Sequence, residues 1–259
     1  AAKHLTPVVL ELGGKSPCII DKSADIDLAA RRIAWGKTLN SGQTCIAPDY
    51  ILIHKDVKEA FVRAFGKEIH SLHGDNPQKD KHYVRIVNEK AFKRISGYIE
   101  NATILFCGHT DAGERYIEPT LIDAPQGDSP VMKEEIFGPV FPIVTLDDSG
   151  RTFLDKVVDY VTSREKPLAF YFFGREKDGW EAVRRTSSGG GCINDVIMHI
   201  ANENVPFGGV GNSGTGHYHG KDSFLAFSHR RSIITTGNWI DLPFRYMPYK
   251  MFGLVKKIL

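Results

Sequence analysis

Short apolar runs alternate with helical patterns in the N-terminal part of the chain, and this alternation constrains the fold more than any other feature. Residues 18–20 and 50–54 are apolar runs of the length expected for buried strands. Apolar residues recur at helical spacing over 26–39 and 57–72. Strands that alternate with amphipathic helices form mainly parallel sheets that helices cover on both faces. The sequence therefore predicts an α/β fold.

The same patterns extend along the rest of the chain. They predict a further short strand over 8–12, and the helix over 26–39 has an N-cap candidate in Asp25. The remaining expected elements are helices over 83–99 and 151–163, strands over 104–107, 120–122, 140–146 and 168–173, and a strand-like segment over 233–236.

Length and charge exclude several classes of function. The 259 residues, 42% of them hydrophobic, suffice for one large core or two unequal lobes. A net charge of +2, without a cluster of basic residues, makes nucleic acid an unexpected partner. The longest apolar runs are far shorter than the roughly 20 residues that span a bilayer. We expect no membrane segment in this chain.

The cysteines and histidines show no metal-binding pattern. The four cysteines have spacings that match no zinc or disulfide arrangement, which favours free thiols in a reducing compartment, and we expect the cytoplasm. His217, His219 and His229 lie close together but lack carboxylate or cysteine partners at ligand spacing. The sequence predicts no metal site.

Glu11 and Cys45 are the strongest candidates for catalysis. Glu11 stands in the segment LELGGK at 10–15, and Cys45 follows the small polar residues SGQT at 41–44. A free cysteine is usually a small buried apolar residue, but such a polar flank favours an accessible loop. A thiol and a carboxylate are the groups needed to form and then hydrolyse a thioester.

A glycine-rich segment at 209–214 matches the dinucleotide-binding pattern G-x-G-x-x-G. That reading is rejected, because Pro206 and Phe207 precede the segment in place of a clear strand and no βαβ unit follows. Its glycines instead permit close backbone approach and positive φ angles.

Five motifs in a fixed order resemble the aldehyde dehydrogenase superfamily, and two of them resemble its class 3 branch, which includes the fatty aldehyde dehydrogenases. The likeness runs from residue 1 to about residue 250. The motifs are LELGGK at 10–15, GQTCIAPDY at 42–50, EEIFGP at 134–139, PFGGVG at 206–211 and YHGK at 218–221. One departure is Val84, where class 3 relatives usually have glycine.

The resemblance implies a catalytic role for the thiol and the carboxylate. Cys45 would attack an aldehyde carbonyl, and Glu11 would be the general base that hydrolyses the resulting thioester. The cofactor would be NAD or NADP, whose nicotinamide ribose Glu135 would bind. Phe137, Leu12 and Gly13 would line the same place.

The resemblance also places residues around the substrate. Tyr218 and His219 would lie at the catalytic pocket, although a supporting polar role is weighed equally. Asn194 resembles a family residue near the thiol, and structural support is the role favoured for it. The substrate would be a medium or long aliphatic, or an aromatic, aldehyde.

The family implies three parts for this chain: residues 1–13 as a remnant of the cofactor-binding domain, 14–231 as the catalytic domain, and 232–259 as a bridging arm and tail. Most of the N-terminal nucleotide-binding domain, with its oxyanion-binding asparagine, is expected to be missing, so the chain would be a fragment. The intact enzyme would be a homodimer.

Two alternatives stay open. The chain could be a truncated, non-oxidative piece that acts in assembly or retains thiol esterase activity. It could also be an unrelated cysteine hydrolase, which would need a histidine beside Cys45; His54 is the nearest downstream.

Overall fold

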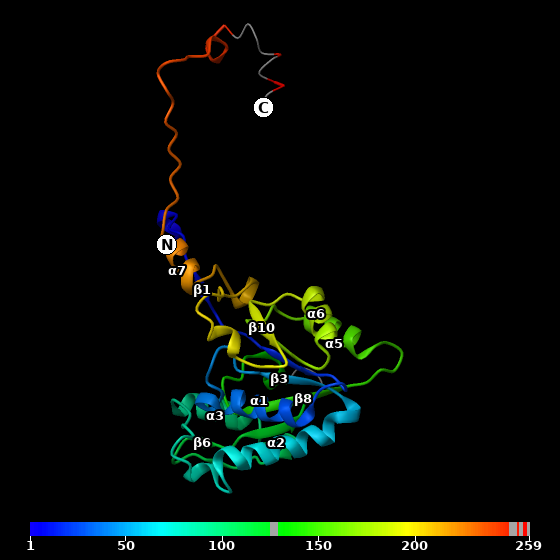
Figure 1. The fold of residues 1–259 in the computed structure, drawn as a ribbon. Coiled ribbons are helices and arrows are strands. Elements are labelled where there is room, and N and C mark those ends of the chain that lie inside the picture. Colours follow the sequence, from blue (N-terminus) through cyan, green and yellow to red (C-terminus); the bar gives the residue numbers. More distant parts are fainter. Residues whose placement is uncertain (125–128, 249–252, 254–255, 258–259) are drawn as a thin grey trace. The chain divides into compact units, whose positions relative to one another are not determined.

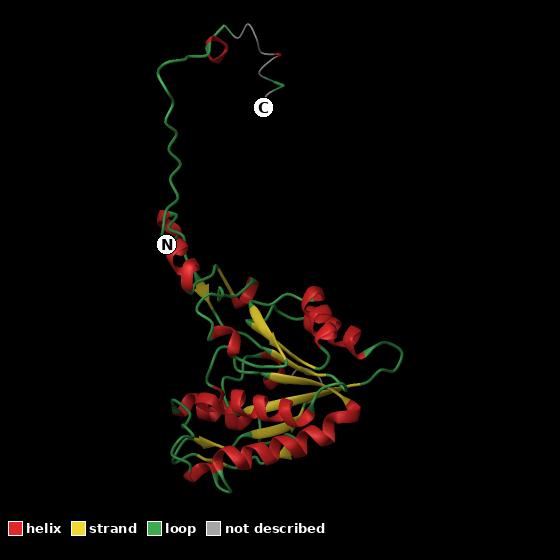
Figure 2. Cartoon of the chain, viewed as in Figure 1, coloured by secondary structure: helices red, strands yellow, loops and turns green. Residues whose placement is uncertain are grey.

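The computed structural model describes residues 1–124, 129–248, 253, 256 and 257, and the chain divides into two compact units, Ala1–Phe227 and Ser228–Leu259. The first unit contains a seven-stranded sheet in the order β10-β9-β2-β3-β8-β7-β4, with helices on both faces (Figures 1 and 2). All neighbouring strands are parallel except β4 and β7. The predicted α/β fold is confirmed.

The sheet strands are β2 (Pro17–Ile20), β3 (Tyr50–His54), β4 (Ile104–Phe106), β7 (Thr120–Asp123), β8 (Val140–Leu146), β9 (Ala169–Phe173) and β10 (Gly190–Ile193). Two small antiparallel pairs lie outside it: β1 (Leu10–Glu11) with β11 (Gly214–Thr215), and β5 (Thr110–Asp111) with β6 (Tyr116–Ile117). The α-helices are α1 (Ile26–Thr38), α2 (Lys58–His73), α3 (Glu89–Gly97), α4 (Pro130–Lys133), α5 (Phe153–Thr162), α6 (Glu176–Arg185) and α7 (Gly220–Ala226).

Alternate residues of the central strands fill two separate cores. In β2, Cys18 and Ile20 belong to the core under α1 and α2, whereas Ile19 belongs to the core under α5 and α6. Strand β9 divides in the same way, with Tyr171 on the first face and Phe172 on the second. Because side chains of a strand point to opposite faces in turn, a strand buried on both faces is apolar throughout.

Helix α1 follows the sequence signals closely. The side chain of Asp25 accepts a hydrogen bond from the Leu28 amide at 3.1 Å, which confirms the predicted N-cap. The helix ends at Thr38, and a 3-10 turn over Leu39–Gly42 leads into the loop that carries Cys45. Helix α1 therefore delivers the candidate nucleophile.

The prediction of a helix over 83–99 is wrong for the first third of that range. Helix α3 begins at Glu89, where the side chain of Asn88 caps the Ala91 amide. The preceding residues bond elsewhere: the hydroxyl of Tyr83 donates to the Ile117 carbonyl at 2.8 Å, and the Ile86 amide donates to Arg115. These distant partners hold the segment in an irregular conformation.

Two predicted strands also differ from the structure. The one over 8–12 shrinks to β1, which is exposed because it pairs only with β11 and not with the main sheet. In the second unit, residues 228–237, all of them described, form neither helix nor strand, so the strand predicted over 233–236 is not formed. Among the described residues, no helix is both long enough and apolar enough to span a bilayer.

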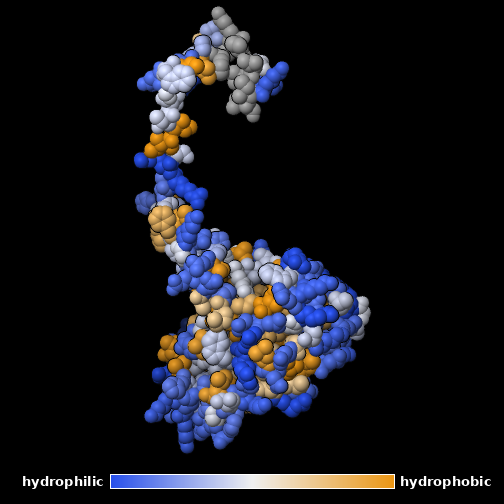
Figure 3. Space-filling view, in the orientation of Figure 1, coloured by the Kyte–Doolittle hydropathy of each residue, from blue (hydrophilic) through white to orange (hydrophobic). Residues whose placement is uncertain are grey.

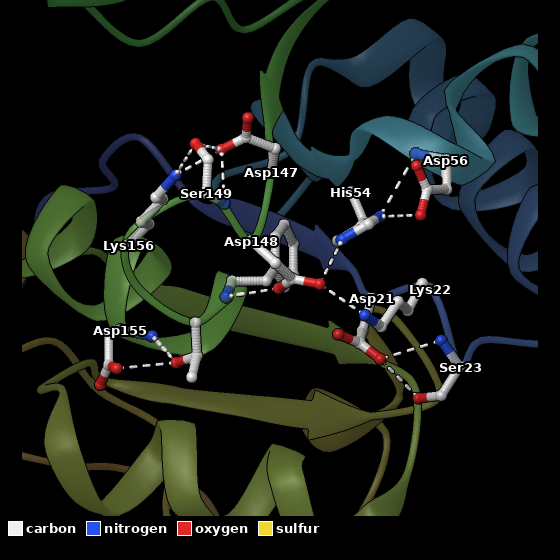
Figure 4. Close-up of polar contacts among 12 residues, drawn as sticks. Asp21, Lys22, Ser23, His54, Asp56, Asp147, Asp148, Ser149, Asp155 and Lys156 are labelled. Carbon is white, nitrogen blue, oxygen red and sulfur yellow. Dashed lines mark hydrogen bonds and ion pairs between the residues drawn. The ribbon is translucent and has the colours of Figure 1, made fainter.

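Most of the molecular face seen in Figure 3 is hydrophilic, with hydrophobic residues in separate patches. At the carboxyl ends of β2, β3 and β8, the polar side chains bond to one another (Figure 4). Asp148 accepts hydrogen bonds from the Phe153 amide, from Lys22, and from the ring of buried His54 at 3.1 Å. This network joins the loops at that edge.

Candidate active site

Three loops carrying predicted site residues meet at the opposite, amino edge of the sheet. Residues 11–15 lead into β2, 45–49 into β3, and 134–139 into β8. These strands are direct neighbours, and all are parallel. Segments far apart in the sequence are thus brought together because parallel strands begin at the same edge.

The Cys45 loop requires unusual backbone angles. Asn40, Ser41 and Gly42 all have positive φ, at 51°, 51° and 72°. A Cβ atom on Gly42 would lie 2.3 Å from the carbonyl oxygen of Gly138, so only glycine permits this approach. The close contact ties the thiol loop to the loop of Glu135.

Gln43 fixes the other side of the same loop. Its side chain donates to the carbonyls of Asn40 at 3.1 Å and Arg85 at 3.2 Å, and it accepts from the Val87 amide at 2.9 Å. A glutamine that uses both ends of its amide in this way holds the loop in one conformation.

Cys45 and Glu11 lie together, as predicted. The Cys45 side chain is half-buried, and the Glu11 side chain is near enough to perturb its pKa. Burial raises the pKa of the Cys45 thiol to about 12, with further contributions from the Glu11 hydrogen bond and charge. The resting thiol is therefore protonated at neutral pH, with a carboxylate at its side.

The glycine-rich loop positions Glu11. Strand β1 pairs Glu11 with Gly214, and a Cβ atom on Gly214 would lie 2.2 Å from the Leu10 carbonyl oxygen. The expected close backbone approach is confirmed at this glycine, whose φ is 143°. The hydroxyl of Tyr218, just beyond the loop, donates to Glu11 at 3.3 Å.

Glu135 lies against the backbone of the Glu11 loop. A Cβ atom on Gly13 would lie 2.8 Å from one of the Glu135 carboxylate oxygens, and the Gly14 amide favours the charged form of the carboxylate. Burial, and after it the neighbouring charge of Asp49, raise the pKa of Glu135 to about 7. The two oxygens of the Glu135 carboxylate have acceptor positions enough for hydrogen bonds from two sugar hydroxyls.

The apolar residues predicted beside Glu135 are uncovered. Leu12 and Phe137 are 61% and 39% exposed, whereas ordinary core residues would be buried. A hollow of about 700 Å³ includes Leu12, Gly13 and Glu135 in its wall. An acceptor flanked by exposed apolar side chains fits the ribose and nicotinamide of a dinucleotide.

The remaining predicted pocket residues divide into two groups. Tyr218 contacts Glu11, and the ring of His219 stacks on Phe207 at 5.5 Å. Asn194 instead bonds to Gly174 with both ends of its amide, each at 2.9 Å. It follows β10, at the carboxyl edge, and its side chain supports the backbone there.

Sequence reasoning missed three charged residues beneath the site: Lys15, Lys37 and Asp49. Lys37 is 1% exposed, and its ammonium donates to the Pro48 carbonyl at 2.9 Å. A signal for it existed, since a lysine three residues after Ala34 occupies the apolar stripe of α1. Burial lowers its pKa to about 8.

Among the described residues, neither a group of metal ligands nor a contact between His54 and Cys45 is found. Within the described ranges, no group of three or more histidine, cysteine, aspartate or glutamate side chains could hold a metal ion. His54 bonds to Asp148 at the carboxyl edge, away from the loop of Cys45.

The fold and the paired thiol and carboxylate define an α/β domain suited to covalent thiol chemistry. The sequence profile of the aldehyde dehydrogenase family matches residues 1–233, and the chain belongs to this family.

Two curated relatives place the chain near the class 3 branch. The rat dimeric NADP-preferring aldehyde dehydrogenase is 50% identical over 235 residues, which are 90% of this chain and 51% of that protein. Mouse aldehyde dehydrogenase family 3 member B1 is 46% identical over 98% of this chain and 54% of that protein. The chain spans about half the length of these relatives.

A solved structure shows the same fold. Staphylococcus aureus AldH, in a substrate-bound state, superposes with a TM-score of 0.93 at 44% identity. The match covers 100% of this chain and 56% of that one. The resemblance seen in the sequence motifs is confirmed.

Proposed function

We propose that this chain supplies the catalytic half of an NAD- or NADP-dependent oxidation of aldehydes to carboxylic acids. The proximity of Cys45 and Glu11 carries the proposal, because it pairs a nucleophile with a base at the amino edge of the sheet. The family match and the NADP preference named for the rat relative support the choice of reaction.

The thiol acts first. As the sulfur of Cys45 bonds to the aldehyde carbon, its proton passes to Glu11 and the carbonyl oxygen gains negative charge. Glu11 is exposed and can return this proton to solvent. A bound nicotinamide supplies the oxidant for the aldehyde carbon; Glu135, Phe137, Leu12 and Gly13 would hold it.

Glu11 then acts as the base for hydrolysis. It takes a proton from water, the hydroxide adds to the thioester carbon of Cys45, and the carbon–sulfur bond breaks. The acid leaves and the thiolate regains a proton. The hydroxyl of Tyr218 holds the Glu11 carboxylate in place for this step.

The surroundings of the thiol suit an apolar substrate. Cys45, Ile200 and Tyr218 pack against the same apolar core, and Ile46 beside the thiol is fully buried. We therefore propose medium or long aliphatic, or aromatic, aldehydes. His219 would lie at the edge of this pocket, beside Tyr218.

The wider organisation follows the family. We propose residues 1–13 as part of the cofactor-binding domain, 14–231 as the catalytic domain and 232–259 as a bridging arm. The name of the dimeric rat relative supports a homodimer for the intact enzyme. Four free cysteines fit a reducing compartment, and we propose the cytoplasm.

Nicotinamide reduction tests the proposal. The purified chain is given an aliphatic aldehyde with NAD or NADP, beside a Cys45→Ala variant. Turnover that disappears in the variant supports the assignment, and native turnover in the variant refutes it. A folded chain without turnover, whose Cys45 still releases nitrophenol from an ester, would favour the non-oxidative alternative.

A further inference from the structure

The carboxylate of Asp49 joins all three loops of the candidate site. Asp49 follows Cys45 by four residues and is 3% exposed. One of its oxygens accepts a hydrogen bond from the Ile136 amide at 2.8 Å, next to Glu135. The other forms an ion pair with Lys15, which follows Glu11 by four residues.

Lys15 extends this junction to the far side of the Glu135 loop. Its ammonium also donates to the carbonyls of Val131 at 2.7 Å and Glu134 at 3.0 Å. All three donor positions of the ammonium are thereby used. Lys37 donates a hydrogen bond to the neighbouring Pro48 carbonyl, so both Lys15 and Lys37 bind the segment that leads into β3.

The charges at this junction act on Glu135 with opposite signs. Asp49 disfavours the carboxylate form of Glu135, whereas Lys15, Lys37 and the Gly14 amide favour it. The charge of Glu135 also raises the pKa of the Cys45 thiol. The guanidinium of Arg94 donates a hydrogen bond to the backbone carbonyl of Glu135 at 3.2 Å. Among these neighbours, Asp49 is the like charge that opposes ionisation of Glu135.

We propose that Asp49 is a positioning residue for Glu135: it anchors the backbone of the Glu135 loop and holds a like charge near its carboxylate. The inference rests on the proposed function, in which Glu135 binds the cofactor ribose. It adds a pair of opposite charges, Asp49 and Lys15, that act on the Glu135 carboxylate in opposite directions.

Carbon-13 NMR of glutamate-labelled protein tests the electrostatic part. The Glu135 carboxyl resonance is identified by its loss in Glu135→Gln, and its titration is followed in the 259-residue chain. In the native protein we expect a midpoint near the raised pKa of about 7. Asp49→Asn should lower this midpoint by about one pH unit, because a like charge is removed.

Lys15→Met provides the decisive comparison, because it removes a cation from the same junction. The midpoint should then rise instead of falling. Asp123→Asn is the matched control: it breaks another aspartate–lysine pair, with Lys58 at 2.7 Å, and should leave the midpoint unchanged. Equal midpoints in the native, Asp49→Asn and Lys15→Met proteins, or shifts of the same sign, would overturn the proposal.

Amide hydrogen exchange tests the anchoring part. Asp49→Asn keeps an oxygen that can accept from the Ile136 amide, whereas Asp49→Ala does not. Exchange at Ile136 should be faster in Asp49→Ala than in Asp49→Asn, and equal protection in the two would contradict the anchor. Neither measurement needs turnover, so failure here is distinct from failure of the proposed oxidation.

Discussion

The resting Cys45 thiol should react slowly with alkylating agents, and removing Glu11 should make it faster. With a pKa of about 12, about one thiol in 10⁴ is ionised at pH 8. A free cysteine of pKa about 8.5 is then about one quarter ionised. The thiolate population is thus lower by a factor of roughly 10³.

Higher basicity offsets part of this loss. Thiolate nucleophilicity rises with pKa with a Brønsted coefficient of about 0.4–0.5, which returns a factor of roughly 40. Alkylation of Cys45 should therefore be about 10²-fold slower than that of free cysteine. Glu11→Gln removes a hydrogen bond and a charge that both raise this pKa, so the rate should increase several-fold.

Iodoacetamide labelling at pH 8, read by peptide mass mapping, measures this rate. Mapping is required because Cys107 is a second accessible thiol. Glu134→Gln is the control, since Glu134 bonds to Tyr98 and does not act on the thiol. Native Cys45 as reactive as free cysteine, or slower labelling in Glu11→Gln, would refute the electrostatic description.

Three further predictions concern the loop, the cofactor and the core. Gly42→Ala should lower the free energy of unfolding by about 2 kcal/mol or more, because the backbone there is left-handed and a Cβ atom would lie 2.3 Å from the Gly138 oxygen. Urea unfolding measures this loss. Gly74→Ala is the control, because Gly74 has the same positive φ but no atom within 4 Å of an added Cβ. Cofactor affinity should fall as pH drops through about 7, because protonated Glu135 loses an acceptor, and titration calorimetry in Glu135→Gln should show a low affinity without this pH dependence. Phe172→Ala should cost about 3–5 kcal/mol, since this ring is 1% exposed under α5 and α6; a change within 1 kcal/mol would be inconsistent with the described packing.

The central strands β2, β3 and β9 could be predicted because they are apolar on both faces, whereas β10, with two glycines and partly exposed, was not predicted. Strands β3 and β8 have the predicted bounds, and α1 begins at the predicted cap. Their signals are local: a run of buried residues, or a capping side chain beside a helical stripe.

The failures occur where distant partners decide the conformation. Residues 83–88 resemble a helix, but their hydrogen bonds run to the segment around β6. Strand β1 pairs only with a glycine-rich loop some 200 residues further along the chain, and this pairing leaves it exposed outside the main sheet. No local pattern encodes either pairing.

The reactive groups of the candidate site could be predicted, but the charged residues beneath it, Lys15, Lys37 and Asp49, were missed. Cys45, Glu11 and Glu135 could be named from their motifs, and the structure brings them to one edge. Ligands in open α/β sheets commonly bind at the carboxyl ends of the strands, yet here that edge holds the mutually bonded network around Asp148. The candidate site forms at the amino edge because β2, β3 and β8 are neighbours, so the loops that lead into them lie together.

The most direct test of the central claim is acylation by p-nitrophenyl acetate, which forms a thioester without any cofactor. The native chain should release nitrophenol beyond one equivalent, whereas Glu11→Gln should stop near one equivalent with the acetyl group on the Cys45 peptide. Cys45→Ala should show no such burst. An acetyl group on another residue, or native turnover in Glu11→Gln, would contradict the assignment of thiol and base.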